Sequence, residues 1–354
     1  MWALAVPGVG IALIDNYQIA SSKTFGVTTA GGSAKVGPQT LFQAASISKP
    51  VAATGAMTLV DKGSLTLDRD VNTYLRSWRV PDNEFTRTEK VTLRRLASHT
   101  AGLNVPSFQG YASGAAVPSI FQILEGQPPS NTPAVRVVHT PGTKAEYSGG
   151  GCLVEQLVIM DLSGQPFEKF MHSAVLEAIG MKDSFFSQPL ASRLAARAAV
   201  GTMPDGRPVD GRWRIHPELA AAGLWTTAND LASFAIEIAR SRKGRSTRLL
   251  SSNAIEQMFK KVPYGDVMGF FTDDRTPGLF AHAGSNQGYS CLLLMNSLSG
   301  QGVSIMTNSD NGNVVYDLVS RRIAQLFNWD ITFPRPPHDI PSAAKSKLLA
   351  LHTR

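Results

Sequence analysis

The stretch Phe42-Gln-Ala-Ala-Ser46-Ile-Ser-Lys49-Pro50 opens an apolar helical run that extends to about Asp61. Three positions correspond to nearly one helical turn, so Ser46 and Lys49 are expected to share a face of this helix. A serine hydroxyl becomes a good nucleophile when a neighbouring group takes its proton, and a lysine one turn away can do this or assist another base. Taken alone, the pattern is common, and the alternative interpretation is a serine near a helix start beside a solvated lysine.

The order of the predicted elements indicates an α+β protein. Strands are predicted at both ends of the chain, at 8–14, 18–28, 267–272, 279–283, 288–296 and 302–307. The middle of the chain is predicted to be helical, at 91–98, 117–125, 152–163, 166–179, 189–197, 228–240 and 252–260, and a last helix is predicted at 312–327. This order predicts a mostly antiparallel sheet, flanked by helices and built from both chain ends, with an inserted helical lobe. We assign 1–68 and 262–354 to the sheet domain and 69–261 to the mainly helical lobe, and we expect an irregular tail from Trp329.

Composition argues against several function classes. The chain has 354 residues and a net charge of +7, but its positive residues are scattered, and the densest cluster, 240–245, has no interleaved aromatic residues. Nucleic-acid binding is therefore not expected. The two cysteines, Cys152 and Cys291, are predicted to be buried free thiols, since so few cysteines in a long chain do not form a disulfide framework. No histidine or cysteine has metal-ligand spacing, so neither a metal nor another cofactor is predicted.

The apolar N-terminal segment, residues 1–14, is predicted to be a first strand rather than a signal segment. It lacks a basic region, and Pro7, Gly8 and Gly10 interrupt it. No apolar run is long enough to span a bilayer. We therefore expect a cytoplasmic protein, unless a leader has been removed.

A second candidate segment runs from Pro141 to Gly151 and contains Tyr147, followed by Ser148-Gly-Gly-Gly151. A tyrosine on such a loop can reach into a cleft between two lobes. Its phenol acts as a base only with a positive charge nearby, which Lys49 is able to supply. The alternative is a half-buried tyrosine that packs beside a glycine-rich turn.

A third candidate segment lies between two predicted strands and reads His282-Ala-Gly284-Ser285-Asn-Gln-Gly-Tyr289. Gly284 would allow a ligand to approach the backbone, and the Ser285 N–H is placed to point into the cleft. By itself, this segment is equally typical of a hairpin with a surface histidine.

Together, Ser46-x-x-Lys49, Tyr147 and His282-Ala-Gly-Ser285 resemble, in this order, the motifs of the serine β-lactamase and penicillin-binding-protein superfamily. The resemblance is to the class C β-lactamase-like branch, which includes the family VIII carboxylesterases. It extends over residues 6–328 and implies a mixed sheet flanked by helices, plus a helical lobe. Further phrases support it: Leu96-Ala-Ser-His-Thr-Ala-Gly-Leu103, Gly180-Met-Lys-Asp-Ser184 and Ala222-Gly-Leu-Trp-Thr-Thr-Ala-Asn-Asp-Leu231.

The resemblance implies a role for each motif residue. Ser46 would be the nucleophile and Lys49 its partner. Tyr147 would be the general base, which first accepts the serine proton and later activates water. The N–H groups of Ser46 and Ser285 would form the oxyanion hole. His282 occupies the position at which these enzymes usually carry the lysine of Lys-Thr-Gly.

Two departures from the family pattern point to the substrate. Gly149 stands where an asparagine usually hydrogen-bonds a substrate amide, and His282 removes a fixed positive charge that would hold a carboxylate. Both favour an uncharged ester over a β-lactam. We expect His282, Gly284 and Gly149 to contact the substrate, with Trp225 as a further pocket wall.

The sequence thus predicts a serine carboxylesterase that forms an acyl-enzyme with a small-molecule ester of short acyl chain. Two alternatives remain open: a class C-like β-lactamase or D-amino-acid peptidase that uses the same chemistry, and a non-catalytic binding protein that keeps the fold. No nucleic-acid partner and no membrane span are predicted. The sequence does not predict an oligomeric state.

Overall fold

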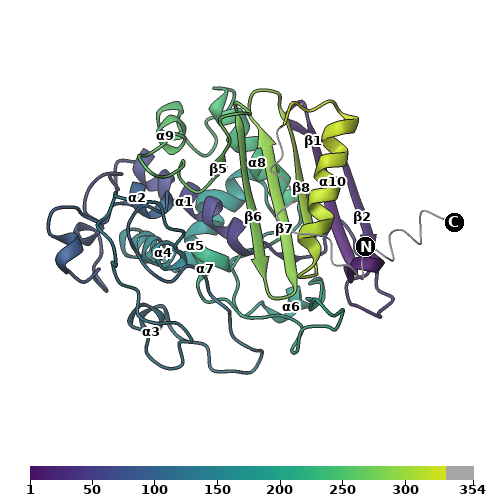
Figure 1. The fold of residues 1–354 in the computed structure, drawn as a ribbon, viewed down its shortest axis with the longest axis horizontal. Helices are drawn as coiled ribbons and strands as arrows, with labels where there is room; N and C mark the ends of the chain where they lie inside the picture. The colour runs from purple at the N-terminus through teal and green to yellow at the C-terminus, as the bar shows by residue number, and fades with distance from the viewer. Residues whose placement is uncertain (332–354) are drawn as a thin grey trace.

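The computed structural model describes residues 1–331, so the predicted tail beyond residue 331 lies outside the described residues. One sheet consists of the strands β1 (Gly8–Asp15), β2 (Gln18–Gly26), β5 (Phe271–Thr272), β6 (Leu279–Asn286), β7 (Tyr289–Asn296) and β8 (Gln301–Thr307). Their order is β2-β1-β8-β7-β6-β5, and every neighbouring pair is antiparallel. The N-terminal hairpin thus pairs with β8, which lies near the other end of the chain (Figure 1). The predicted α+β architecture, a mostly antiparallel sheet flanked by helices and built from both chain ends, is confirmed.

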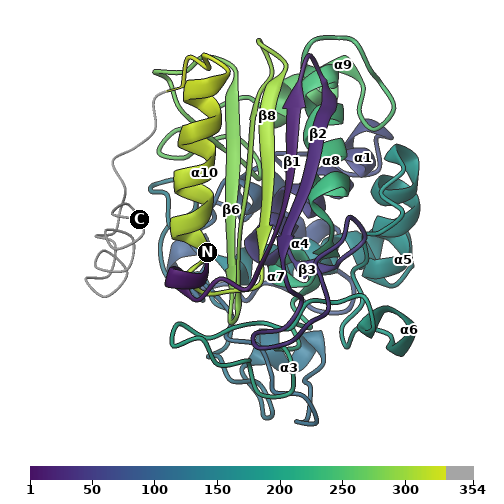
Figure 2. The ribbon, with the colours of Figure 1, turned by 90° about the vertical axis from the view of Figure 1, so that its right-hand side faces the viewer.

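Helices cover both faces of the sheet. α10 (Gly312–Leu326) lies on one face, and α8 (Ala228–Arg242) lies on the other (Figures 1 and 2). A small apolar core beneath α10 includes Val9, Val303 and Val315, and a much larger core fills the space on the α8 side. Because both faces are covered, the central strand β7 is buried along nearly its whole length, and its apolar residues form a continuous run at 291–295 rather than alternating with polar ones.

The remaining elements form the helical part and the connections to it. The helices are α1 (Ser48–Asp61), α2 (Leu93–Ala97), α3 (Ile120–Glu125), α4 (Gly149–Ser163), α5 (Phe167–Met171), α6 (Ser192–Ala195), α7 (Leu219–Ala222) and α9 (Ser252–Met258). A two-stranded ladder joins β3 (Phe42–Gln43) to β4 (Trp225–Thr226). Short 3-10 turns are η1 (Trp2–Leu4), η2 (Ala45–Ile47), η3 (Val71–Thr73), η4 (Glu84–Thr86) and η6 (Glu177–Ile179). The helix predicted at 166–179 is divided, because a π-helical turn, η5 (His172–Leu176), separates α5 from η6.

α1 is the central helix of the molecule and is buried on all sides from Ser48 to Leu59. Its small residues make this possible: a side chain at Gly55 would overlap the sulfur of Met171. The helix predicted from Ser46 is correct in its extent, but it begins as the 3-10 turn η2, which places Ser46 just before the first α-helical residue.

α8 links two phrases of the sequence that are far apart along the chain. Thr227 caps the helix by accepting a hydrogen bond from the Asp230 N–H. The Asp230 carboxylate accepts bonds from the Asp183 N–H and the Ser184 hydroxyl, both at 2.8 Å. Hydrogen bonds to the Asp230 carboxylate therefore hold the motif residues 180–184 against the start of α8, within the motif residues 222–231.

The predicted domain boundaries stay a prediction. The sheet strands do fall within 1–68 and 262–331, but α8, in the range assigned to the helical lobe, packs against β1, β7 and β8. Within residues 1–331, none of the helices combines the length and apolar character that crossing a bilayer requires.

Candidate active site

Ser46 and Lys49 are in direct contact. The Lys49 Nζ donates a hydrogen bond to the Ser46 Oγ at 2.9 Å and a second to the backbone carbonyl of Ala221 at 2.8 Å. Ser46 is half-buried, whereas Lys49 is only 4% exposed. The expected placement of both side chains on one face therefore occurs, and α7 supplies a second, fixed acceptor that holds the ammonium group at the serine.

The backbone before Ser46 is strained. Ala45 has a φ of +50°, in the left-handed region that residues with a Cβ seldom adopt. The Ser48 hydroxyl donates to the Ala45 carbonyl at 2.6 Å and accepts from the Leu224 N–H at 3.0 Å. Ser48 thus holds the turn that presents Ser46 at the N-terminal end of α1, where the helix dipole favours negative charge on the serine oxygen.

Tyr147 directly precedes α4, and its ring lies close to the lysine. The Lys49 Nζ is 4.8 Å from the centre of the Tyr147 ring. The next residue, Ser148, caps α4 by accepting the Gly151 N–H at 2.9 Å. The glycines that follow allow the helix to start tightly against a loop, since a Cβ at Gly150 would lie 2.7 Å from the Asn104 carbonyl. Tight packing of α4 therefore fixes the position of Tyr147.

The His99 side chain packs against the Tyr147 ring. Its ring packs against the tyrosine ring in a tilted arrangement with centroids 4.4 Å apart, and its Nδ1 accepts a hydrogen bond from the Ser148 N–H at 3.3 Å. Burial, reinforced by the charge of Lys49, lowers the pKa of His99 to about 3. The sequence interpretation used His99 only as part of a family phrase, and its φ of +58° is a signal that no sequence pattern reveals.

The backbone N–H of Ser285 is free to point away from β7. Asn286 and Tyr289 close the β6–β7 hairpin around the two-residue turn 287–288, in which Gly288 has a φ of +86°. The closing pair of such a hairpin exchanges hydrogen bonds, so the neighbouring residue, Ser285, directs its N–H to the opposite edge of β6. Along that edge β5 pairs only with residues 280–281.

Gly284 allows β6 to approach the segment that carries Ser46. A side chain at Gly284 would overlap the carbonyl oxygen of Ala44 and would lie 2.7 Å from the Cys291 sulfur. β6 packs against η2 for this reason. The predicted role of Gly284 was close approach of a ligand, whereas the structure places the Ala44 backbone against it.

His282 is buried, with 3% of its surface exposed, and lies near Tyr147 with ring centroids 6.5 Å apart. Its Nδ1 lies 2.6 Å from the Ala283 carbonyl, which only accepts, so Nδ1 carries the proton. The Nε2 is then an acceptor, and no partner for it occurs within residues 1–331. Burial lowers the pKa of His282 to about 3, so the ring is neutral. The position usually occupied by a lysine therefore carries no fixed charge here.

The structure does not bring two of the expected contact residues to a cavity. Gly149 is buried in the first turn of α4, and a Cβ there would lie 2.8 Å from the Phe108 ring. Trp225 has no exposed surface and packs edge-on against Trp213 and Tyr289. Trp225 is therefore part of the apolar core and does not form the expected pocket wall.

No carboxylate among residues 1–331 lies within salt-bridge distance of Lys49. Burial raises the pKa of both Glu155 and Glu218 to about 8, so these two carboxyl groups are neutral at pH 7. The thiols are equally inert, since burial raises the pKa of Cys152 to about 12 and also raises that of Cys291. Ser46, whose hydroxyl accepts a hydrogen bond from Lys49, is therefore the candidate nucleophile.

Two cavities flank this group of residues. The Ser285 cavity, of about 670 Å³, is lined by residues that include Phe108, Gly110, Asn131, Arg214, Ser285 and Gln287. The Tyr147 cavity, of about 340 Å³, is lined by residues that include His99, Tyr147, Tyr264, Asp266, Phe271 and His282.

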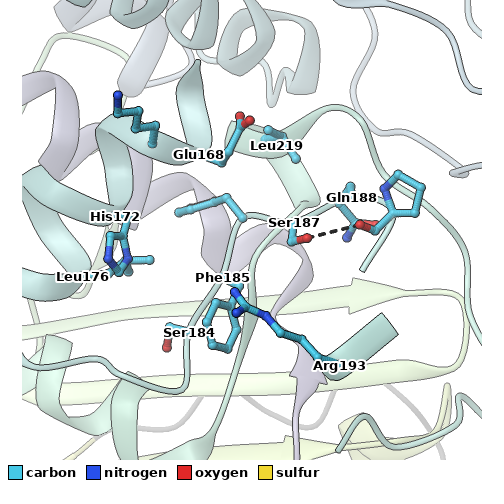
Figure 3. Close-up of a pocket in the computed structure, with 12 residues that line it drawn as sticks. Glu168, His172, Leu176, Ser184, Phe185, Ser187, Gln188, Arg193 and Leu219 are labelled. Carbon is cyan, nitrogen blue, oxygen red and sulfur yellow. Dashed lines mark hydrogen bonds between the residues drawn. The ribbon is translucent and has the colours of Figure 1, made fainter. Parts of the chain in front are cut away.

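A third cavity, of about 460 Å³, is separate from these two and is lined by none of the candidate site residues. Figure 3 shows its walls, which carry the exposed side chains of Glu168, His172 and Arg193.

The buried His216 makes stability depend on pH. Neither ring nitrogen has a hydrogen-bond partner within the described part of the chain, and burial lowers the pKa of His216 to about 3. An unfolded histidine binds a proton below about pH 6.5, whereas the folded ring stays neutral, so stability falls as the pH falls from 6.5 towards 3. The slope is about 1.4 kcal/mol per pH unit.

We therefore expect His216→Gln to reduce the loss of unfolding free energy between pH 7 and pH 5 by roughly 2 kcal/mol. Urea unfolding of both proteins at the two pH values measures this loss. His172→Gln, at an exposed position, is the matched control and should lose as much as the original protein. An equal loss in all three proteins would show that His216 protonates in the folded state.

The sequence profile of the beta-lactamase family matches residues 1–327 of this chain. The chain is also 26% identical, over 325 residues, to penicillin-binding protein 4 of Amycolatopsis lactamdurans, and this match covers 86% of the chain and 81% of that protein.

Solved structures of similar fold have lower sequence identity. The octameric penicillin-binding protein homologue from Pyrococcus abyssi superimposes with a TM-score of 0.74 at 23% identity, covering 99% of this chain and 79% of that one. The D-amino acid amidase from Ochrobactrum anthropi SV3 superimposes with a TM-score of 0.72 at 20% identity, covering 91% and 94%. At these identities the likeness concerns the fold alone.

Proposed function

This chain belongs to the beta-lactamase family, a family of serine hydrolases, and from this premise we propose that it is a carboxylesterase that hydrolyses short acyl esters through an acyl-enzyme. The observation that carries the proposal is the hydrogen bond of 2.9 Å from the Lys49 Nζ to the Ser46 Oγ, with Tyr147 beside the same ammonium group. This arrangement places a nucleophile in contact with a positive charge, and the ring of a phenol lies beside the same charge.

In the acylation step, Tyr147 accepts the proton of the Ser46 hydroxyl while the Oγ attacks the ester carbonyl carbon. The carbonyl π electrons move to the oxygen, and the N–H groups of Ser46 and Ser285 stabilise the oxyanion. When the tetrahedral intermediate collapses, the bond to the alcohol oxygen breaks and Tyr147 donates its proton to that oxygen. Lys49 remains beside Ser46 and Tyr147 and stabilises negative charge on either oxygen.

Deacylation repeats these steps with water. Tyr147 accepts a proton from a water molecule, whose oxygen attacks the acyl carbon. The bond to the Ser46 Oγ then breaks, the serine recovers its proton from Tyr147, and the carboxylic acid leaves. The same residues therefore serve both halves of the reaction.

Two features of the site favour an ester over a lactam or amide. The Phe108 ring occupies the space next to Gly149 into which an asparagine side chain would project. A substrate amide would therefore lack the hydrogen bond that such a side chain provides. His282 is neutral, so the Tyr147 cavity offers no fixed cation for the carboxylate of a β-lactam.

The alternatives within the family are a β-lactamase and a D-amino-acid amidase or peptidase, and the likeness to the D-amino acid amidase keeps the second of these open. A binding protein without activity is the alternative from another class. It has no need for a lysine that is 4% exposed and directed at a half-buried serine.

Parallel kinetics distinguish these possibilities. We expect kcat/KM for p-nitrophenyl butyrate to exceed the values for nitrocefin and for a D-amino acid amide by roughly tenfold or more. A larger value for nitrocefin or the amide would replace the esterase proposal with that activity. No turnover of any of the three by folded protein would favour the binding protein.

A further inference from the structure

The Ser285 and Tyr147 cavities receive different halves of the substrate under the proposed mechanism. Tyr147 returns a proton to the leaving alcohol, so the alcohol half must lie on the side of the Tyr147 cavity. The carbonyl oxygen faces the Ser285 N–H, and Ser285 lines the other cavity, so that cavity is left for the acyl half. The lining of the Ser285 cavity therefore determines which acyl groups fit.

Arg214 is the cationic side chain of the Ser285 cavity, and it is held at two points. Its backbone carbonyl accepts a hydrogen bond from the Gln43 Nε2 at 2.7 Å, and its Nε donates to the Gln287 Oε1. The next residue, Ile215, exchanges two backbone hydrogen bonds of 2.8 Å with Tyr111, which fixes the backbone beside Arg214. The guanidinium group is therefore positioned before any substrate arrives.

The two Nη atoms of this guanidinium group are available to bind a ligand. Within residues 1–331, neither Nη atom of Arg214 makes a hydrogen bond, and no carboxylate lies within 4.0 Å of it. The acidic residue of the same cavity, Asp310, directs its Oδ1 to the Gly288 N–H at 2.7 Å. Two parallel N–H donors of an arginine match the two oxygens of a carboxylate.

We propose that Arg214 selects acyl groups that carry a carboxylate, an inference that rests on the proposed esterase function. The substrate class is then the monoesters of dicarboxylic acids, with the ester carbonyl at Ser46 and the free carboxylate at Arg214. The neutral His282 and the cationic Arg214 lie in different cavities, so the negative charge belongs to the acyl half and not to the alcohol.

The Tyr147 cavity is suited to an apolar or aromatic alcohol. Phe271 is 46% exposed and stacks on Tyr147 with centroids 6.4 Å apart, and Tyr264, in the same cavity, is 72% exposed. An aromatic leaving group covers such rings at little cost in polar desolvation. A p-nitrophenyl ester is therefore a suitable probe for the acyl half.

The test compares p-nitrophenyl hydrogen adipate with its methyl ester, methyl p-nitrophenyl adipate, which has the same length and no charge. We expect the ratio of kcat/KM for the acid to that for the methyl ester to be roughly 10 to 100, the range for a hydrogen bond to a charged group. Arg214→Gln should lower this ratio to about 1, and Arg214→Lys should give an intermediate value, since a lysine keeps the charge but not the fork. Because both esters are measured with the same protein, the ratio does not depend on how much of that protein is folded.

Arg193→Gln is the matched control, because it removes one positive charge from the separate cavity in Figure 3 and should leave the ratio unchanged. A ratio near 1 in the original protein, no change in Arg214→Gln, or an equal fall in Arg193→Gln would each overturn the inference. If both esters are hydrolysed without preference, the esterase proposal stands and only the role of Arg214 is lost. If neither is hydrolysed but p-nitrophenyl butyrate is, the esterase proposal again stands and the role of Arg214 is lost; if none of the three esters is hydrolysed, both proposals fail.

Discussion

Replacing Ser46 with alanine is expected to lower kcat/KM for p-nitrophenyl butyrate by roughly 10⁴- to 10⁶-fold, the range for loss of a catalytic serine. The nucleophilic Oγ is removed, so no acyl-enzyme forms and only the oxyanion hole and binding contacts remain. The Ser46 side chain is half-buried and its Oγ is bonded to the Lys49 Nζ, so the change to alanine leaves the core of α1 intact.

A fluorophosphonate probe gives an independent measurement of the same serine. Its phosphorus should bond to the Ser46 Oγ with loss of fluoride, and mass spectrometry should find the label on the peptide that contains Ser46. Ser48→Ala is the neighbouring control, because its hydroxyl holds the Ala45 turn and is fully buried, so this variant should lose stability but keep the label. Ester hydrolysis by Ser46→Ala at the original rate would remove Ser46 as the nucleophile.

Tyr147→Phe is expected to lower kcat by about 10²- to 10⁴-fold, the usual contribution of a general acid–base group. Phenylalanine keeps the ring that packs against His99 and Phe271 and removes only the hydroxyl, so the fold should persist. Because the same hydroxyl is proposed to act in both steps, the variant should slow release of p-nitrophenol and hydrolysis of the acyl-enzyme alike. Single-turnover measurements separate these two steps.

Tyr264→Phe is the matched control for this variant. It removes a phenol from the same cavity at a position that is 72% exposed, and it should change kcat by less than about threefold, as expected of a surface substitution. Unchanged kcat in Tyr147→Phe, with thermal unfolding also unchanged, would transfer the role of base to Lys49.

Local patterns were sufficient to predict most of the elements. The hairpin strands predicted at 8–14 and 18–28 and the helical run from Ser46 to Asp61 each follow from the spacing of neighbouring residues, which fixes periodicity over short distances. The helix predicted at 166–179 was less accurate, because its π-helical turn at 172–176 is a departure from regular geometry that the apolar spacing does not signal.

The sequence by itself determined the order Ser46, Lys49, Tyr147, Ser285 and the fold that these motifs imply, since helical spacing and glycine placement act within a few residues. Only the tertiary structure decided what surrounds them. Phe108 fills the space beside Gly149, Trp225 belongs to the core and Arg214 lines the Ser285 cavity, and each of these placements depends on contacts between residues distant in the chain. Such contacts arise from packing of whole elements, which periodicity within one element does not encode.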